Sequence, residues 1–120
     1  MSGMACRVLI VDDHAEFRAL ARAMLERGGF EVVGEAVDGA QTLTAVERTR
    51  PEVVLLDVQL PDVNGFDVAR VLCECEGAPV VVMTSSRDAA DFGGRLERSG
   101  ARGFIAKSRL SGAALAELVS

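Results

Sequence analysis

The sequence lacks any apolar run approaching the roughly 20 residues that a helix needs to cross a bilayer. Residues 1–4 also lack the basic segment followed by an apolar segment that marks a secretory signal peptide. The chain has 120 residues, of which 49% are hydrophobic, and this is enough for one core. We therefore expect a single domain over residues 1–120, a cytoplasmic location and no membrane partner.

Basic side chains are scarce and scattered. Lysine and arginine together number 13 against 18 acidic residues, which gives a net charge of −5, and no basic run occurs. A sequence-independent grip on nucleic acid needs lysine and arginine clustered on one surface. The composition therefore argues against direct nucleic-acid binding, and it makes the position of the one lysine, Lys107, informative.

Cysteine is limited to Cys6, Cys73 and Cys75, an odd number that cannot form a complete set of disulfides. The single residue between Cys73 and Cys75 is the wrong spacing for a zinc knuckle or a redox pair. We expect three reduced thiols, buried or half-buried.

Short apolar runs alternate with helical patterns along the chain, as in proteins built from βαβ units. Strands are predicted at residues 7–11, 32–36, 53–56, 80–83 and 103–106. Helices are predicted at residues 14–27, 40–48, 66–74 and 88–98, and from a cap at Ser111 to the end of the chain. Asp38 is expected to cap the second helix. The fourth helix is the least favourable, because Gly93-Gly94 lies inside it at a cost of about 1 kcal/mol per glycine.

Helical spacing also predicts which side chains face the core. In the first helix these are Phe17, Leu20, Ala21, Met24 and Leu25. In the second helix they are Leu43 and Val46.

The alternation predicts an α/β fold, a doubly wound (βα)5 three-layer sandwich. Right-handed crossovers favour this arrangement, and the common order for five parallel strands is 2-1-3-4-5, the flavodoxin-like order. Such sheets bind ligands outside the carboxyl ends of their strands.

Polar residues follow four of the predicted strands. Asp12-Asp13 follow the first, Asp57 the third, Thr84 the fourth and Lys107 the fifth. In the predicted strand order these four strands are neighbours, with ends about 4.8 Å apart from one strand to the next. We expect the four positions to line one shallow cleft.

Three carboxylates in one cleft repel one another, and without a partner at least one of them has a raised pKa. Lys107 offsets part of this repulsion, and a hard divalent cation offsets more. Mg²⁺ prefers oxygen ligands and keeps several waters, so two carboxylates and a backbone carbonyl suit it. A carboxylate beside Mg²⁺ and a lysine can act as a nucleophile toward phosphorus.

These elements together resemble the receiver domains of two-component response regulators, over about residues 7–119. The resemblance rests on Asp12-Asp13, Asp57, the loop Leu60-Pro61-Asp62-Val63-Asn64-Gly65, Thr84, and Lys107 after Gly103-Phe104-Ile105-Ala106. The Asp-Asp-His start and the Ser108 that follows Lys107 are similar to receivers that usually carry a helix-turn-helix output domain. We expect a stand-alone receiver or one whose output module is on another chain. We also expect a trans bond before Ser108.

The resemblance implies a role for each matched residue. Asp57 accepts a phosphoryl group from a histidine kinase or a phosphotransfer protein. Asp12 and Asp13 hold Mg²⁺, Asp13 directly, together with Asp57 and the backbone carbonyl of Gln59. Thr84 and Lys107 contact the new phosphate.

The resemblance also implies a switch. Phe104 occupies the position of the aromatic residue that rotates inward as Thr84 moves; a fixed core phenylalanine is the alternative. The face formed by the fourth helix, fifth strand and fifth helix then reports to an unknown downstream protein or forms a homodimer. Gly93-Gly94 puts the regularity of that face in doubt.

Other functions remain open at this point. A degenerate receiver that binds partners without phosphorylation keeps the same residues. An aspartyl-phosphate phosphatase needs a second acid two residues after its nucleophile, where this chain has Gln59, and a flavin phosphate would be repelled by Asp12-Asp13. Beyond its own phosphorylation and dephosphorylation we expect no enzyme activity. His14 is expected to begin the first helix, and a phosphate-carrying role is the alternative.

Overall fold

The computed structural model describes residues 5–120, so the expectations for residues 1–4 lie outside it. The strands are β1 (Arg7–Val11), β2 (Glu31–Ala36), β3 (Val53–Asp57), β4 (Val80–Ser85) and β5 (Gly103–Ala106). The helices are α1 (Ala15–Arg27), α2 (Gly39–Thr49), α3 (Gly65–Glu74), α4 (Arg95–Arg98) and α5 (Gly112–Val119). There are also two 3₁₀ turns in the described residues: η1 (Ala89–Phe92) precedes α4, and η2 (Lys107–Arg109) follows β5.

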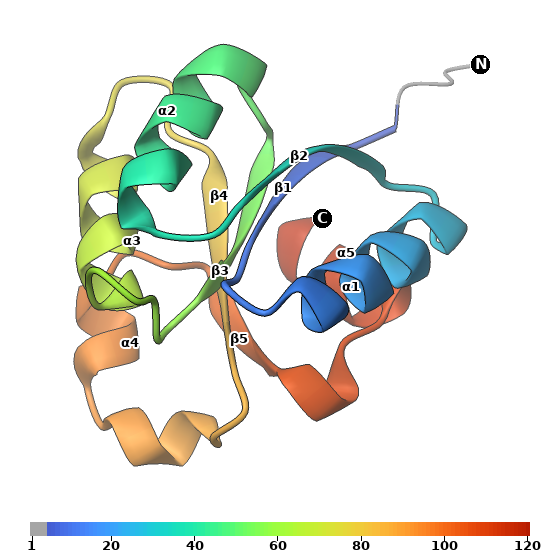
Figure 1. The fold of residues 1–120 in the computed structure, drawn as a ribbon. Helices are drawn as coiled ribbons and strands as arrows, with labels where there is room; N and C mark the ends of the chain where they lie inside the picture. The colour runs from blue at the N-terminus through green and yellow to red at the C-terminus, as the bar shows by residue number, and fades with distance from the viewer. Residues whose placement is uncertain (1–4) are drawn as a thin grey trace.

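The five strands form one parallel sheet in the order β2-β1-β3-β4-β5, which confirms the predicted order. Helices α2, α3 and α4 cover one face of the sheet, and α1 and α5 cover the other (Figure 1). The flavodoxin-like three-layer prediction is therefore confirmed.

The strands are apolar on both faces because both faces are covered. Alternate side chains of β1 and β3 separate into two cores. Leu9 and Leu56 belong to the core under α2 and α3, whereas Ile10 and Leu55 belong to the core under α1 and α5. Central strands buried on both sides keep the carboxyl ends of β1 and β3 fixed relative to each other.

Capping residues set the helix ends close to where the sequence predicts them. The Asp38 carboxylate accepts a hydrogen bond from the Gln41 N–H at 2.8 Å, and the Ser111 hydroxyl accepts one from the Ala114 N–H at 3.0 Å. His14 occupies the N-cap position of α1, so it begins that helix as expected.

The predicted helix over residues 88–98 is wrong as one continuous element. The segment divides into the 3₁₀ turn η1 and the four-residue α4, with Gly93 between them at φ 57° and ψ −134°. This backbone conformation is open to glycine and strained for other residues. The glycine pair therefore ends the first turn and redirects the chain.

Two inward predictions are also wrong. Leu20 on α1 is 56% exposed and Leu43 on α2 is 42% exposed, although both fall within the apolar stripe of the sequence. The other predicted inward residues of these helices lie in the cores or pack against them: Phe17, Ala21, Met24, Leu25 and Val46.

The three cysteines are free; Cys6 and Cys73 are half-buried as expected, but Cys75 is exposed. No peptide bond within residues 5–120 is cis, which confirms the trans bond before Ser108. None of the described helices has the length and apolarity needed to cross a membrane.

Candidate functional site

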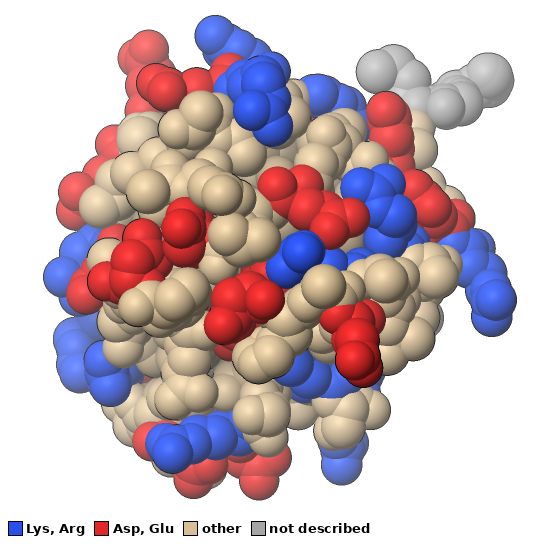
Figure 2. Space-filling view, in the orientation of Figure 1, with Lys and Arg blue, Asp and Glu red and all other residues tan. Residues whose placement is uncertain are grey.

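The sheet places the predicted site residues at one edge. Asp57 is the last residue of β3 and is paired in register with Thr84 of β4. Asp12 directly follows β1, and Lys107 directly follows β5. Figure 2 shows carboxylates gathered near the centre of the visible face, where these strands end in Figure 1.

Lys107 joins the two buried carboxylates. Its ammonium nitrogen lies 2.5 Å from Asp12 Oδ2 and 3.3 Å from Asp57 Oδ2. The Asp12 side chain is completely buried and that of Asp57 nearly so, whereas the Lys107 side chain remains 17% exposed. One cation is thus shared between two carboxylates, which leaves an uncompensated negative charge at the edge of the sheet.

The environment of Asp57 works against its ionisation. Burial is the largest influence and, with the nearby charge of Asp12, it raises the pKa of Asp57 to about 6. The Gln59 N–H, which donates to Asp57 Oδ1 at 3.1 Å, and the Lys107 ammonium act in the opposite direction. The expected raised pKa is thus present, and desolvation contributes more to it than repulsion does.

Lys107 stays charged in this setting. Burial alone lowers its pKa, but hydrogen bonding and charge from Asp12 and Asp57 outweigh burial and raise the pKa above its usual value. The ammonium also lies 4.6 Å from the centre of the Phe17 ring. Contact with an aromatic face stabilises a cation and limits the directions in which the lysine can turn.

Asp13 and His14 extend the acidic group toward solvent. His14 Nδ1 lies 3.0 Å from Asp12 Oδ1 and 3.1 Å from Asp13 Oδ1. Ligand atoms from these three residues and Asp57 lie within 4.8 Å of one another. Three carboxylates in such a group offer the hard oxygen donors that Mg²⁺ prefers, so the donor set fits that ion.

Thr84 has an unsatisfied polar atom beside Asp57. Its hydroxyl oxygen is buried and has no hydrogen-bond partner among the described residues. Leaving such a hydroxyl unpaired costs about 1–3 kcal/mol. A ligand oxygen placed beside Asp57 would remove that cost.

Gln59 is exposed and lies in the loop after β3, where it forms an isolated antiparallel bridge with Asn64. The Asn64 side chain caps α3 by accepting from the Phe66 N–H at 2.8 Å. Two residues before Asn64, Asp62 accepts from the Gly39 and Ala40 N–H groups of α2 at 2.8 and 3.1 Å. The loop that carries the Gln59 carbonyl is therefore held by the bridge between its own two ends and by hydrogen bonds to the first turn of α2.

Phe104 lies apart from the carboxylates, in β5 and half-buried. Its ring centre is 5.9 Å from that of Phe92, which in turn lies 5.4 Å from that of Phe66. This chain of aromatic contacts connects β5 to η1 and α3. The inward rotation of Phe104 stays a prediction.

Sequence reasoning missed Arg18. Its guanidinium donates to the Asp12 carbonyl oxygen at 2.7 Å and to Glu35 at 2.9 Å, and so ties the loop after β1 to α1 and β2. No sequence motif marks this residue, although its position four residues after His14 places it on the same side of α1.

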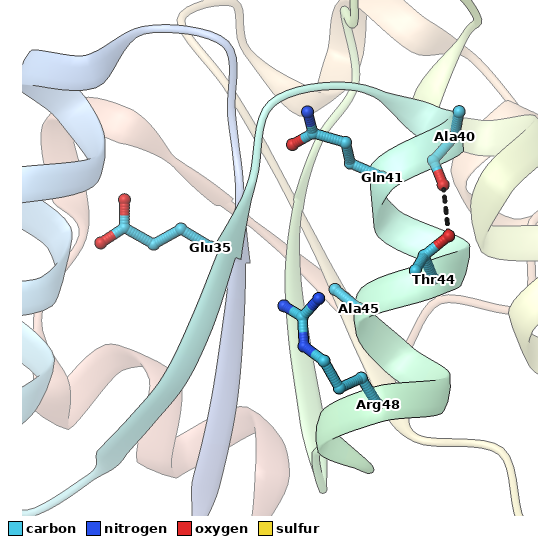
Figure 3. Close-up of a pocket in the computed structure, with 6 residues that line it drawn as sticks. All are labelled: Glu35, Ala40, Gln41, Thr44, Ala45 and Arg48. Atoms are coloured by element: carbon cyan, nitrogen blue, oxygen red, sulfur yellow. Dashed lines mark hydrogen bonds between the residues drawn. The ribbon is translucent and has the colours of Figure 1, made fainter.

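A separate hollow of about 280 Å³ lies between β2 and α2 (Figure 3). Its lining includes Glu35 and Arg48 but none of the predicted site residues. The Glu35 carboxylate is already bound by Arg18 and Arg22, each at 2.9 Å. The carboxylate of this hollow is therefore already paired, and Arg48 is the other charged residue in its lining.

The fold and site define a class of protein: a doubly wound domain with an acid cluster, a lysine and a hydroxyl around one carboxylate. The family model "Response regulator receiver domain" matches residues 8–119, and the chain belongs to this family. Phosphorylation-dependent signalling is the general function of these domains, which interact with histidine kinases and downstream effectors.

Known relatives agree with this assignment. The chain is 44% identical over 109 residues to the DNA-binding response regulator MtrA of Mycobacterium tuberculosis, covering 89% of this chain and 46% of that protein. A LuxR-family response regulator from Aurantimonas has a TM-score of 0.83 and 29% identity, with 95% of this chain and 81% of that one covered. The BeF3-activated receiver domain of Klebsiella pneumoniae RstA has a TM-score of 0.80 and 27% identity, with 93% and 94% covered. The chain spans about half the length of the MtrA relatives, so their DNA binding is a property of those proteins.

Proposed function

We propose that Asp57 is the phosphoryl acceptor of this receiver domain and that the phosphorylated domain acts as a signalling module. The observation that carries the proposal is the position of the Lys107 ammonium, which contacts the carboxylates of both Asp57 and Asp12. This contact supports the proposal because it holds a positive charge beside Asp57, where phosphoryl oxygens would arrive, while ligand atoms of Asp12, Asp13 and Asp57 stay grouped for a cation. The whole chain, residues 1–120, is proposed to act as one such domain.

In the proposed reaction an Asp57 carboxylate oxygen forms a bond to phosphorus. The bond between phosphorus and a histidine nitrogen of the donor breaks, and the imidazole keeps the electron pair and takes up a proton. The donor is a histidine kinase or a phosphotransfer protein. Later attack by water releases inorganic phosphate, and no other substrate is turned over.

The proposed cation ligands are the carboxylates of Asp13 and Asp57 and the backbone carbonyl of Gln59, with Asp12 supporting them. When bound there, Mg²⁺ neutralises phosphoryl oxygens. Lys107 contributes a second positive charge, and the Thr84 hydroxyl donates a hydrogen bond that it lacks in the structure described above.

We propose that this new bond draws Thr84 inward and that Phe104 follows it. Because η1 and α4 form no continuous helix, the surface that changes comprises short segments around β5 and α5. A downstream protein, or a second copy of the chain, would read that surface in a cytoplasmic setting. Direct nucleic-acid binding forms no part of the proposal.

The test is the intact mass of the protein after incubation with acetyl phosphate, with and without Mg²⁺. The wild type is expected to gain one phosphate that requires Mg²⁺, survives acid and is lost in alkali. Asp57→Ala is expected to gain none, while Asp91→Asn, which changes an exposed acid of η1, is expected to behave as the wild type.

A phosphate that persists in Asp57→Ala would contradict the assignment. If neither protein gains a phosphate, beryllium fluoride binding separates the remaining cases. Binding indicates a very short-lived phosphate, whereas a folded protein that binds none is a degenerate receiver, and the proposal fails.

A further inference from the structure

Helices α2 and α3 leave an apolar groove between them. It has a volume of about 320 Å³ and includes the apolar side chains Leu43, Val63, Val68 and Val71. Leu43, Val63 and Val71 are 42%, 41% and 48% exposed. These are three of the four large exposed hydrophobic residues found in residues 5–120, so the exposure is concentrated rather than scattered. Concentrated apolar exposure on a small domain marks an interaction site.

The edge of this groove is acidic. Asp62 and Asp67 are the charged residues among those that line it, and neither lysine nor arginine contributes to that lining. The Gly39 N–H, and other backbone N–H groups, hold the pKa of Asp62 below its usual value, so this carboxylate is negative at neutral pH. Figure 2 shows carboxylates within a largely uncharged surface where α2 and α3 lie side by side in Figure 1.

The shape and charge of the groove select one kind of occupant. Parallel ridges of two neighbouring helices accept a third helix that presents apolar residues at positions i, i+3 or i+4, and i+7. The two carboxylates favour lysine or arginine beside that stripe. A second copy of this chain is disfavoured because a two-fold contact would bring the acidic edges together, and the chain carries a net charge of −5.

We propose that the α2–α3 groove is a docking site for an amphipathic helix of another protein, one with an apolar stripe flanked by basic residues. The groove is distinct from the β5 and α5 surface and does not contain Asp57 or Lys107. It shares Asp62 and Val63 with the Gln59–Asn64 loop, but helix binding there can be measured without phosphoryl transfer.

The test uses a synthetic peptide of about 18 residues, long enough to form a helix, with a leucine stripe and flanking arginines. It is titrated into ¹⁵N-labelled protein, and amide shifts are followed by NMR. Shifts are expected on α2, on α3 and around Val63. A peptide with glutamate in place of arginine is expected to bind at least about tenfold more weakly, and added salt is expected to narrow this difference.

Two protein variants localise the binding. Val71→Asp places a charge in the groove and is expected to weaken binding about tenfold, the range of a residue central to an interface. Leu20→Asp is the matched control, because Leu20 is the other large apolar residue that is about half exposed, and it lies on the opposite side of the sheet. It is expected to bind as the wild type.

Several outcomes would overturn the proposal: no peptide binding to the folded protein, shifts centred on other elements, or equal losses in Val71→Asp and Leu20→Asp. Groove shifts that appear with protein concentration alone would identify a second copy as the occupant instead. Each of these outcomes is readable on Asp57→Ala as well, so it is separable from failure of the phosphoryl-transfer proposal.

Discussion

At the scale of single residues, Asp57 shares the Lys107 ammonium with Asp12, and burial makes its carboxyl group harder to ionise. Its folded-state pKa of about 6 exceeds the 3.8 of an unperturbed aspartate. At Asp57 the folded protein therefore binds more protons than the unfolded chain between about pH 4 and pH 6. The contribution of this one group to stability falls as the pH rises through this window.

Asp57→Asn removes that ionisation and is expected to raise the melting temperature above pH 6 by about 5 °C. At pH 4 the gain is expected to be small, because Asp57 is then largely protonated in the wild type. Thermal unfolding in EDTA at several pH values measures the difference, with Asp91→Asn as the control. An equal gain at every pH would mean that the ionisation of Asp57 is not its source.

Lys107 has the opposite relation to pH. Because the pKa of Lys107 is raised in the folded state, its ammonium stabilises the fold fully at pH values below the pKa of a free lysine. This contribution is lost as the pH rises through the pKa of Lys107 in the folded protein. Lys107→Met leaves Asp12 buried without a cation, and the expected cost is about 3 kcal/mol in urea unfolding.

The double variant Asp12→Asn, Lys107→Met is the matched control for that change. It removes the buried charge together with its partner, so it is expected to recover much of the loss. If the loss of unfolding free energy in the double variant equals the sum of the losses in Asp12→Asn and Lys107→Met, the contact between the two side chains contributes nothing.

At the scale of elements, the start of α3 lies against the end of β3. A Cβ at Gly65 would lie 2.1 Å from the Asp57 carbonyl oxygen and 2.9 Å from the Val58 Cα. Both neighbours are backbone atoms, so they cannot move aside as a flexible side chain can. The absence of a side chain at Gly65 therefore allows α3 to begin directly beside Asp57.

Gly65→Ala is expected to cost about 3 kcal/mol, the upper range for overpacking, and to slow phosphorylation by displacing Asp57. Gly77→Ala is the control, because a Cβ there meets nothing within 4 Å and only the positive φ of 71° opposes it. Its expected cost is about 1 kcal/mol. Similar losses in the two variants, measured in urea, would remove close packing as the explanation.

The elements also show how far the sequence predicts the structure. Strand positions follow directly from the apolar runs, because a parallel strand that is buried on both faces must be apolar at nearly every position. Periodicity predicts the inward face of α1 except for Leu20, but in α2 it is right for Val46 and wrong for Leu43. The exposure of Leu20 and Leu43 depends on how far each helix leans over the sheet, a tertiary property.

The segment after β4 was predicted less well for a related reason. Apolar residues at Phe92 and Leu96 have helical spacing, but the helix is interrupted where Gly93 adopts a positive φ. The site residues were placed at the correct edge because each follows a strand. The ring of Phe17 and the guanidinium of Arg18 approach the site from α1, and no motif reports a contact of that kind.

At the scale of the whole molecule, the proposed cation site exists only in the folded chain. The carboxylates come from the ends of β1 and β3, which are brought together only in the folded chain. Mg²⁺ at 100 times its dissociation constant is therefore expected to raise the free energy of unfolding by about 2.7 kcal/mol.

Asp13→Asn is expected to lose most of this stabilisation, since it removes an exposed carboxylate with little structural role. Thermal unfolding across a Mg²⁺ titration measures the effect, with Asp91→Asn as the matched control for the lost charge. If Mg²⁺ stabilises Asp13→Asn as much as the wild type, the cation binds elsewhere.

The attachment of the Gln59–Asn64 loop to α2 has a practical consequence for building hybrid proteins. Asp62 is bonded to the first turn of α2, and a Cβ on Gly39 would lie 2.5 Å from a methyl group of Val63. These two segments are far apart in sequence, yet each is shaped to the other. A chimera that takes the Gln59–Asn64 loop from one receiver and α2 from another would mismatch these contacts. Residues 38–40 and 57–65 must therefore be transplanted as one block.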